Sequence, residues 1–126
     1  MMVLVTGGAG FIGSHLVRAL LARGEHVRVF DNFSTGTAAN LAGLDGSLEI
    51  LEGDLRDAAR VAEAVAGAEV IFHQAAMVSV PLSMQDPETC FATNEGGTRH
   101  LLEAARATGV RRVVLASSGA VYGQQP

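Results

Sequence analysis

Residues 2–13 read MVLVTGGAGFIG, a short apolar run that breaks into glycines and then begins a helix. The uniformly hydrophobic run 2–5 is typical of a parallel strand buried on both faces. The glycines fit G-x-G-x-x-G at Gly8, Gly10 and Gly13, or G-x-x-G-x-x-G at Gly7, Gly10 and Gly13. Backbone without Cβ atoms can turn sharply and approach a diphosphate, and a helix N-terminus attracts phosphate groups. The stretch therefore predicts dinucleotide binding, with a plain tight turn as the alternative.

Composition limits the class of protein. The chain has 126 residues, of which 48% are hydrophobic and 17% charged, with a net charge of −4. These values are typical of one globular α/β domain, and they argue against a disordered chain or a nucleic-acid-binding surface. The single cysteine, Cys90, excludes an internal disulfide framework and suits a reducing compartment, so we expect a cytoplasmic protein. We expect no membrane partner, since no apolar run reaches the length of a membrane span or resembles a signal peptide.

Strand and helix patterns alternate along most of the chain, and residues 32–46 are predicted to be a loop with one helical turn near residues 38–44. After the first strand, further strands are predicted at 26–30, 47–52, 69–73 and 111–116, and helices at 11–23, 57–66 and 86–108. This predicts an α/β Rossmann-type parallel sheet with five strands in the order 3-2-1-4-5 and helices on both faces. We expect one domain over residues 1–126. In helix 11–23 the apolar face is predicted to contain Ile12, Leu16, Ala19 and Leu20.

An acidic residue follows the second predicted strand. Asp31 lies 18 residues after Gly13, close to the spacing of a carboxylate that binds the ribose hydroxyls of a dinucleotide. A carboxylate there repels a 2′-phosphate, and no basic residue follows before Arg56, so NAD is favoured over NADP. The alternative is that Asp31 merely ends a strand.

Several other candidates follow strand ends on the same predicted edge of the sheet. Asp54 either hydrogen-bonds an adenine amino group or caps the next helix. The small residues after His73 allow a ligand to lie close to the backbone at Gln74, Ala75 and Ala76. His73 itself is expected to be a packed, hydrogen-bonded residue rather than a catalytic one. In the mixed segment 77–85, Ser79 and Ser83 either face a ligand or satisfy turn hydrogen bonds.

Two polar residues in the last third of the chain are also candidates. Asn94 lies on an inward helix face together with Phe91, Thr98, Leu101, Leu102 and Ala105, so it needs a backbone or ligand partner. Ser118 follows the fifth predicted strand, where its hydroxyl either contacts a substrate or makes a local turn bond. No metal site is expected.

The motifs TGGAGFIG, VFDN, GDLRD, HQAA, SVPLSMQDP, NEGGT and SSGAVYG together resemble extended short-chain dehydrogenase/reductases. The similarity is greatest to NAD-dependent nucleotide-sugar 4-epimerases that act on UDP-sugars. It spans all 126 residues but only the N-terminal part of that family's architecture, so the substrate domain is expected to be absent. The resemblance also implies a homodimer, with the helix from Pro87 to Thr108 at the interface.

The resemblance implies a role for each matching residue. The diphosphate is contacted by Phe11 and Ile12, and the adenosine ribose is held by Asp31, Asn32, Ser34, Thr35 and Gly36. Adenine is held by Asp54 and Leu55. The inner part of the cofactor is lined by Gln74, Ala75, Ala76, Val78 and Asn94. Ser118 assists catalysis by hydrogen-bonding the sugar hydroxyl that is oxidised. The implied reaction moves a hydride from sugar C4 to NAD and returns it to the other face of the 4-keto sugar.

The chain departs from the family pattern in the catalytic base, which is a tyrosine in a Tyr-x-x-x-Lys pair. Tyr122 is the only tyrosine, it lies four residues after Ser118, and the chain contains no lysine. A phenol needs a nearby cation to lower its pKa towards neutrality, so this chain alone is predicted to be inactive. Three hypotheses remain: an NAD-binding portion of an epimerase, a stand-alone NAD-binding or sensing module, and a structural unit that dimerises through residues 87–108.

Overall fold

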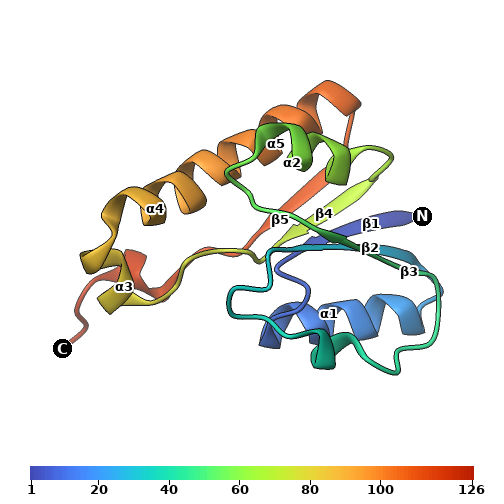
Figure 1. The fold of residues 1–126 in the computed structure, drawn as a ribbon, viewed down its shortest axis with the longest axis horizontal. Coiled ribbons are helices and arrows are strands. Elements are labelled where there is room, and N and C mark those ends of the chain that lie inside the picture. Colours follow the sequence, from blue (N-terminus) through green and yellow to red (C-terminus); the bar gives the residue numbers. More distant parts are fainter.

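The computed structural model describes residues 1–126 (Figure 1). Its five-stranded sheet has the order β3-β2-β1-β4-β5, and each pair of neighbouring strands is parallel. The strands are β1 Met2–Thr6, β2 His26–Asp31, β3 Leu48–Glu52, β4 Val70–His73 and β5 Arg112–Leu115. The predicted fold class and strand order are therefore confirmed.

The helices are α1 Phe11–Ala22, α2 Ala58–Val65, α3 Val80–Gln85, α4 Pro87–Phe91 and α5 Gly97–Thr108. Between α4 and α5 lies a π-helical segment, η2 Ala92–Gly96, and two 3-10 turns occur at η1 Ala38–Leu41 and η3 Gly119–Tyr122. Helix α1 covers one face of the sheet, and α2 and α5 cover the other (Figure 1).

The two faces of the sheet form two cores because side chains alternate along each strand. On one face, Leu4, Phe30 and Ile71 pack against α2 and α5. On the other face, Val5 and Val29 pack against α1, together with other buried residues of the sheet, the helix and η1. The apolar run 2–5 of β1 is buried on both faces of the sheet from Val3 onward, as its composition predicted.

The buried face of α1 differs from the predicted one. Its buried residues are Gly13, Ser14, Val17 and Leu21, whereas Ile12 is 63% exposed and Ala19 also faces solvent. The cause is the glycine turn, because Gly13 packs so closely that a Cβ there would overlap the carbonyl oxygen of Gly7. Positions 13, 17 and 21 share one helical face, so this contact turns that face to the sheet.

The segment after β4 holds a helix that the pattern did not predict. Ser79 caps α3 by accepting from the Leu82 N–H at 3.3 Å, and the Ser83 hydroxyl donates to the Val80 carbonyl at 2.7 Å. Both serines therefore make local hydrogen bonds, which was one of the two interpretations. Asp86 caps α4, confirming the predicted helix start at Asp86 and Pro87.

The predicted helix 86–108 is interrupted by the π-helical turn η2. The extra residue of a π turn rotates the preceding helix relative to the following one. Leu101 and Ala105 are buried as predicted, but Phe91 is 67% exposed and Leu102 is 46% exposed. The inward face predicted for this helix is therefore wrong at Phe91 and Leu102.

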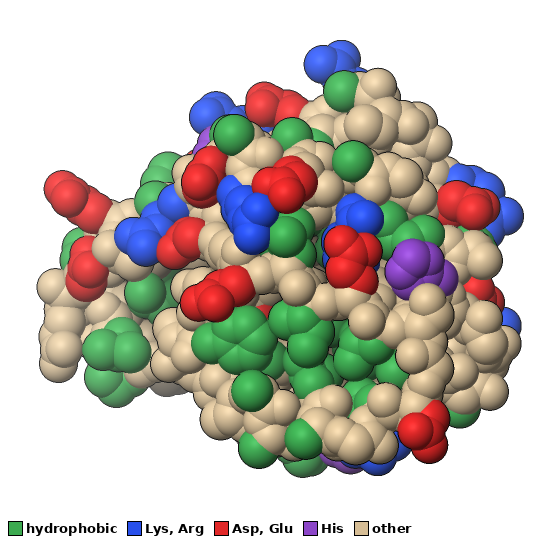
Figure 2. All heavy atoms as spheres, turned by 45° about the vertical axis from the view of Figure 1, so that its right-hand side comes forward, with side chains coloured by type: hydrophobic (Ala, Val, Ile, Leu, Met, Phe, Trp, Pro, Cys, Tyr) green, Lys and Arg blue, Asp and Glu red, His purple; other side chains and the backbone are tan.

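The surface carries charges of both signs. On the face shown in Figure 2, acidic and basic side chains are interspersed and no basic stripe is present. None of the helices combines the length and the apolar content needed to cross a membrane. No group of three His, Cys, Asp or Glu side chains is arranged to hold a metal ion.

Candidate functional site

The loops that carry the predicted site residues leave the sheet at one edge. Thr6 at the end of β1 pairs with Phe30 of β2 and with His73 of β4. Farther out, Asp31 pairs with Glu52 at the end of β3, and His73 pairs with Leu115 at the end of β5. Because all five strands are parallel, their carboxyl ends form the crevice where such sheets bind ligands.

The glycine turn after β1 packs backbone directly against backbone. Gly7 has φ +69°, and a Cβ on it would lie 2.8 Å from the Ala75 nitrogen. Gly13 packs on Gly7, as described above. A Cβ on Gly10 would contact only the Gly7 carbonyl oxygen, at 3.3 Å. Gly7 and Gly13 therefore close the turn, and Gly10 leaves its outer side accessible to a ligand.

The N-terminus of α1 is open. Gly10 precedes the helix and supplies no side-chain cap, so the first N–H groups, those of Phe11, Ile12 and Gly13, have no partner within the helix. Phe11 is 80% exposed and Ile12 is 63% exposed, so both side chains point away from the core. Unpaired N–H groups at the positive end of a 12-residue helix suit a diphosphate.

Asp31 connects the end of β2 to the glycine turn. Its side chain is buried, with Oδ2 accepting from the Ala9 N–H and Oδ1 from the Phe33 N–H, both at 2.9 Å. A carboxylate offers about four acceptor positions, so about two stay available for ribose hydroxyls. Phe33 has φ +56°, a strained conformation for a residue with a side chain. Asp31 thus does more than end a strand.

The loop after Asp31 folds over Ala9. Gly36 packs against Ala9, where a Cβ would lie 2.8 Å from the Ala9 carbonyl carbon, and the Thr37 N–H donates to the Ala9 carbonyl at 3.1 Å. The Ser34 N–H donates to Asn32 Oδ1 at 3.0 Å. Asn32, Ser34 and Thr35 are exposed, so their side chains are accessible beside the glycine turn.

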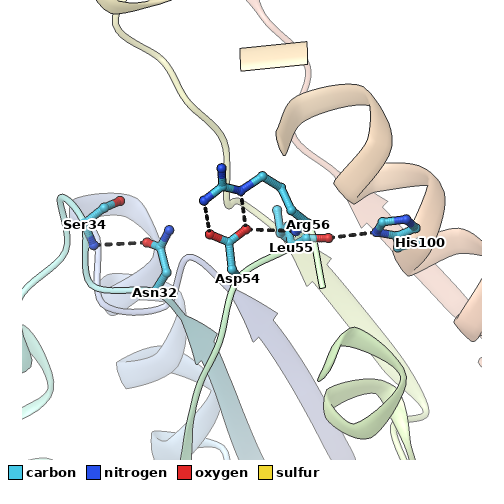
Figure 3. Close-up of polar contacts among 6 residues, drawn as sticks. All are labelled: Asn32, Ser34, Asp54, Leu55, Arg56 and His100. Carbon is cyan, nitrogen blue, oxygen red and sulfur yellow. Dashed lines mark hydrogen bonds and ion pairs between the residues drawn. The ribbon is translucent and has the colours of Figure 1, made fainter. Parts of the chain in front are cut away.

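Asp54 forms a close ion pair with Arg56 (Figure 3). Its Oδ1 accepts from the Arg56 backbone N–H at 2.8 Å and from Nε at 3.0 Å, and its Oδ2 accepts from Nη2 at 2.8 Å. Chiefly through these hydrogen bonds, Arg56 lowers the pKa of Asp54 to about 2, so the group is ionised at neutral pH. The cap of α2 is Asp57, which accepts from the Arg60 N–H at 3.1 Å, so the capping interpretation of Asp54 is wrong.

Leu55 lies between this edge and the core. Its side chain is 4% exposed and packs under Gly97, where a Cβ would lie 2.6 Å from the Leu55 Cβ. Its carbonyl oxygen accepts from His100 Nδ1 at 2.9 Å (Figure 3). These two contacts hold the Asp54 loop against α5.

His73 is a buried, hydrogen-bonded residue, as expected. Its Nδ1 lies 2.6 Å from Thr6 Oγ1, and its Nε2 lies 2.9 Å from Thr98 Oγ1. The Thr98 hydroxyl hydrogen is donated to the Asn94 carbonyl at 2.6 Å, so Thr98 accepts from His73 and the proton is on Nε2. Burial lowers the pKa of His73 to about 4, and the ring is neutral at pH 7.

The sequence patterns did not single out Thr6, and they gave Thr98 only a place on an inward helix face. Thr6 Oγ1 donates its hydrogen to His73 and accepts from the Gln74 and Ala75 N–H groups at 3.2 Å each. This network holds the segment after β4 against the glycine turn. A threonine that ends a buried strand directly before the glycines is the only sequence signal for it.

Asn94 has a backbone partner. Its Oδ1 accepts from the Met77 N–H at 2.8 Å, and its Nδ2 donates to the Met77 carbonyl at 3.0 Å. The amide thus fixes the segment 74–78 from the side of α5, with Val78 85% exposed at the rim. The direct contact of Asn94 with a cofactor stays a prediction.

Ser118 makes the local turn bond. Its Oγ accepts from the Ala120 N–H at 3.1 Å and caps the turn η3. The side chain is exposed, and its hydroxyl hydrogen is free for another acceptor. Tyr122 in the same turn is 76% exposed. The substrate contact of Ser118 stays a prediction.

The chain is similar in sequence and structure to known NAD-binding and sugar-modifying proteins. Residues 3–126 match the NAD dependent epimerase/dehydratase family. A UDP-glucose 4-epimerase of Mycolicibacterium smegmatis is 48% identical over 130 residues, covering 100% of this chain and 42% of the relative. The crystal structure of the UDP-glucose 4-epimerase of Thermus thermophilus in complex with NAD has a TM-score of 0.90 and 46% identity, covering 100% of this chain and 40% of that chain.

The similar structures also include another named activity. DesIV, a dTDP-glucose 4,6-dehydratase of Streptomyces venezuelae with NAD and TYD bound, has a TM-score of 0.92 and 41% identity, covering 100% of this chain and 42% of that chain. The chain thus spans about two fifths of the length of each of these three proteins.

Proposed function

Because the chain belongs to the NAD-dependent epimerase/dehydratase family, we propose that it binds NAD and forms the NAD-binding portion of a nucleotide-sugar 4-epimerase. The observation that carries the proposal is the pairing of an open helix N-terminus with a buried carboxylate at the same edge of the sheet. The N–H groups at the start of α1 suit a diphosphate, and the free acceptor positions of Asp31 suit a ribose diol.

The residues fit the cofactor by their chemistry. We assign the diphosphate to Gly7, Gly10, Phe11, Ile12 and Gly13, and the adenosine ribose to Asp31, Asn32, Ser34, Thr35 and Gly36. We assign the adenine to Asp54 and Leu55, and the inner part of the cofactor to Gln74, Ala75, Ala76, Val78 and Asn94. No arginine or histidine hydrogen-bonds or pairs with Asp31, which supports selection of NAD over NADP.

The proposed reaction exchanges a hydride with C4 of a UDP-sugar. NAD, when bound, supplies a group that accepts the hydride and returns it. The free hydroxyl hydrogen of Ser118 is oriented by the Ala120 N–H, and we assign it to the sugar hydroxyl. The chain contributes a single tyrosine and no lysine, so it does not itself supply a Tyr-x-x-x-Lys pair. We therefore propose that residues 1–126 bind NAD without turning over a sugar.

An NAD titration of the purified chain by calorimetry tests the proposal. We expect saturable binding of NAD and weaker binding of NADP. Adding UDP-glucose to the NAD-loaded chain should give no absorbance of reduced cofactor at 340 nm. Absence of saturable NAD binding would refute the cofactor site, and turnover of the sugar would refute the inactivity.

The missing lysine supports a second candidate, a stand-alone NAD-binding or sensing module. The two candidates agree on NAD binding and differ in whether a catalytic base is supplied from outside residues 1–126. Finding a Tyr-x-x-x-Lys segment in the same gene, encoded after Pro126, would favour the epimerase. A gene that encodes no such segment would favour the module.

We also propose a homodimer through the helical segment from Pro87 to Thr108. Its outer face exposes Phe91 and Leu102, and a shallow hollow there is lined by Asn94, Glu95, Thr98, Arg99, Leu102, Glu103 and Arg106. Exposed apolar side chains on a helix face favour association. Sedimentation velocity tests this: a monomer at all concentrations would refute the dimer.

A further inference from the structure

We propose that Arg56 is a positioning residue that makes the site selective for adenine, because it orients the Asp54 carboxylate and leaves one acceptor position for the amino group of the base. This inference rests on the proposed binding of NAD. It assigns to Arg56 a role that neither the glycine turn nor Asp31 can supply, since those groups contact the diphosphate and the ribose.

Arg56 differs from the other arginines near this part of the fold. Arg60 donates to the Glu52 carbonyl and pairs with Glu63 at 2.6 Å on the surface of α2. Arg28 binds Glu49 and the last carbonyls of α2. Arg56 instead lies at the carboxyl edge, where its guanidinium and its backbone N–H all point to one carboxylate (Figure 3).

The hydrogen bonds from Arg56 leave Asp54 with one acceptor position. A carboxylate has about four such positions, two on each oxygen. Oδ1 accepts two N–H groups of Arg56, and Oδ2 accepts one. The remaining position belongs to Oδ2, and the Asp54 side chain is 29% exposed, so a ligand can reach it.

The direction of that position depends on Arg56. The guanidinium is planar and holds both carboxylate oxygens, so the carboxylate plane cannot rotate while the pair is intact. Asn32 lies on the other side of Asp54, where its side chain is a further hydrogen-bonding neighbour that lowers the pKa of Asp54, and its oxygen is held by the Ser34 N–H (Figure 3). The position that Arg56 leaves therefore lies beside the Asn32 side chain, on the side of the predicted ribose site, and an amino group of a ligand competes with Asn32 for it.

An ionised acceptor at that position distinguishes two purines. The 6-amino group of adenine donates a hydrogen bond to it, whereas the 6-oxo group of hypoxanthine is an acceptor and is repelled. One hydrogen bond to a charged group corresponds to a factor of about ten or more in affinity. Without Arg56, the carboxylate can rotate and meet water, so this discrimination should largely disappear.

The test compares binding of NAD with binding of nicotinamide hypoxanthine dinucleotide by calorimetry. We expect the wild-type chain to bind NAD at least about tenfold more tightly than the analogue. Arg56→Ala should reduce this ratio to about two or less, mainly by weakening NAD. Arg56→Lys, which keeps the charge without the planar contact, should give an intermediate ratio. Arg60→Ala is the matched control and should keep the wild-type ratio.

Each outcome has a separate meaning. An Arg56→Ala chain that keeps the wild-type ratio overturns the role of Arg56 while leaving the NAD site intact. A wild-type chain that binds neither dinucleotide overturns the proposed function and this inference together. If Arg56→Ala does not fold, as judged by circular dichroism, Arg56→Gln replaces it, and a wild-type ratio in that variant overturns the inference.

Discussion

Thr6 Oγ1 and His73 Nδ1 lie 2.6 Å apart, and this contact joins the strand before the glycine turn to the strand end beside it. The same Thr6 oxygen accepts from the Gln74 and Ala75 N–H groups, so its capacity is filled while His73 is neutral. A proton on Nδ1 would place a third donor against that oxygen and leave the threonine hydrogen without this acceptor. The network is therefore built for an uncharged His73.

We expect the stability of the chain to depend on pH through His73. The pKa of this ring is about 4 in the fold, against an ordinary value of 6.5. Between these two pH values the unfolded chain binds a proton at His73 that the folded chain does not bind. The contribution of neutral His73 to the free energy of unfolding is therefore fully present above pH 6.5 and is lost as the pH falls towards 4. This difference between the two pKa values corresponds to a change of about 3 kcal/mol in the free energy of unfolding.

Urea unfolding of the wild type and of His73→Gln between pH 4 and pH 7 measures this effect. The variant should be less stable at neutral pH but should lose less stability on acidification. His15→Gln, which changes an exposed histidine of α1, is the control and should follow the wild-type curve. Parallel curves for the wild type and His73→Gln would contradict the prediction.

Asp31→Ala should weaken NAD binding by about tenfold or more and reduce the preference for NAD over NADP, because the acceptors for the ribose and the repulsion of a 2′-phosphate are both removed. The change also leaves the Ala9 and Phe33 N–H groups without their acceptor, which costs about 2 kcal/mol of stability. Calorimetric titration with each dinucleotide measures the first effect. Asp45→Ala, in an exposed loop, is the control. Unchanged affinities for both dinucleotides would remove Asp31 from the site.

Gly13→Ala should reduce the free energy of unfolding by about 3 kcal/mol, because the added methyl group overlaps the carbonyl of Gly7 and neither backbone can move aside cheaply. Gly96→Ala is the matched control. A Cβ there contacts nothing within 4 Å and the backbone has φ −60°, so this variant should be as stable as the wild type or slightly more stable. Thermal or urea unfolding of both variants checks this. Equal stability of the two would show that Gly13 does not need the close contact.

Asn94→Ala should loosen the segment after β4, because both hydrogen bonds to the Met77 backbone are lost. Hydrogen exchange should show faster exchange of the Met77 amide, while the amides of β1 keep their protection. Glu95→Ala, the exposed neighbour, should leave the Met77 amide unchanged. If the Met77 amide of Asn94→Ala exchanges as slowly as in the wild type, other contacts hold the segment after β4.

The sequence by itself determined the order of the sheet and the edge at which the site lies. Apolar runs such as residues 2–5, with helices predicted after three of the five strands, favour a parallel sheet with right-handed crossovers. Once the strands are parallel, the glycine turn, Asp31 and Asp54 must leave it at the same edge. Asp86 before Pro87 likewise specified a helix start through local chemistry.

The tertiary structure alone decided which side chains meet. The buried face of α1 depends on the packing of Gly13 against Gly7, and the face of Phe91 depends on the π turn η2. Leu55, between Asp54 and Arg56, meets His100 of α5, which lies 45 residues away in the sequence. His73 joins Thr6 and Thr98, which are 67 and 25 residues away from it. Periodicity and spacing describe the backbone near each residue, whereas these contacts depend on how distant segments fit together.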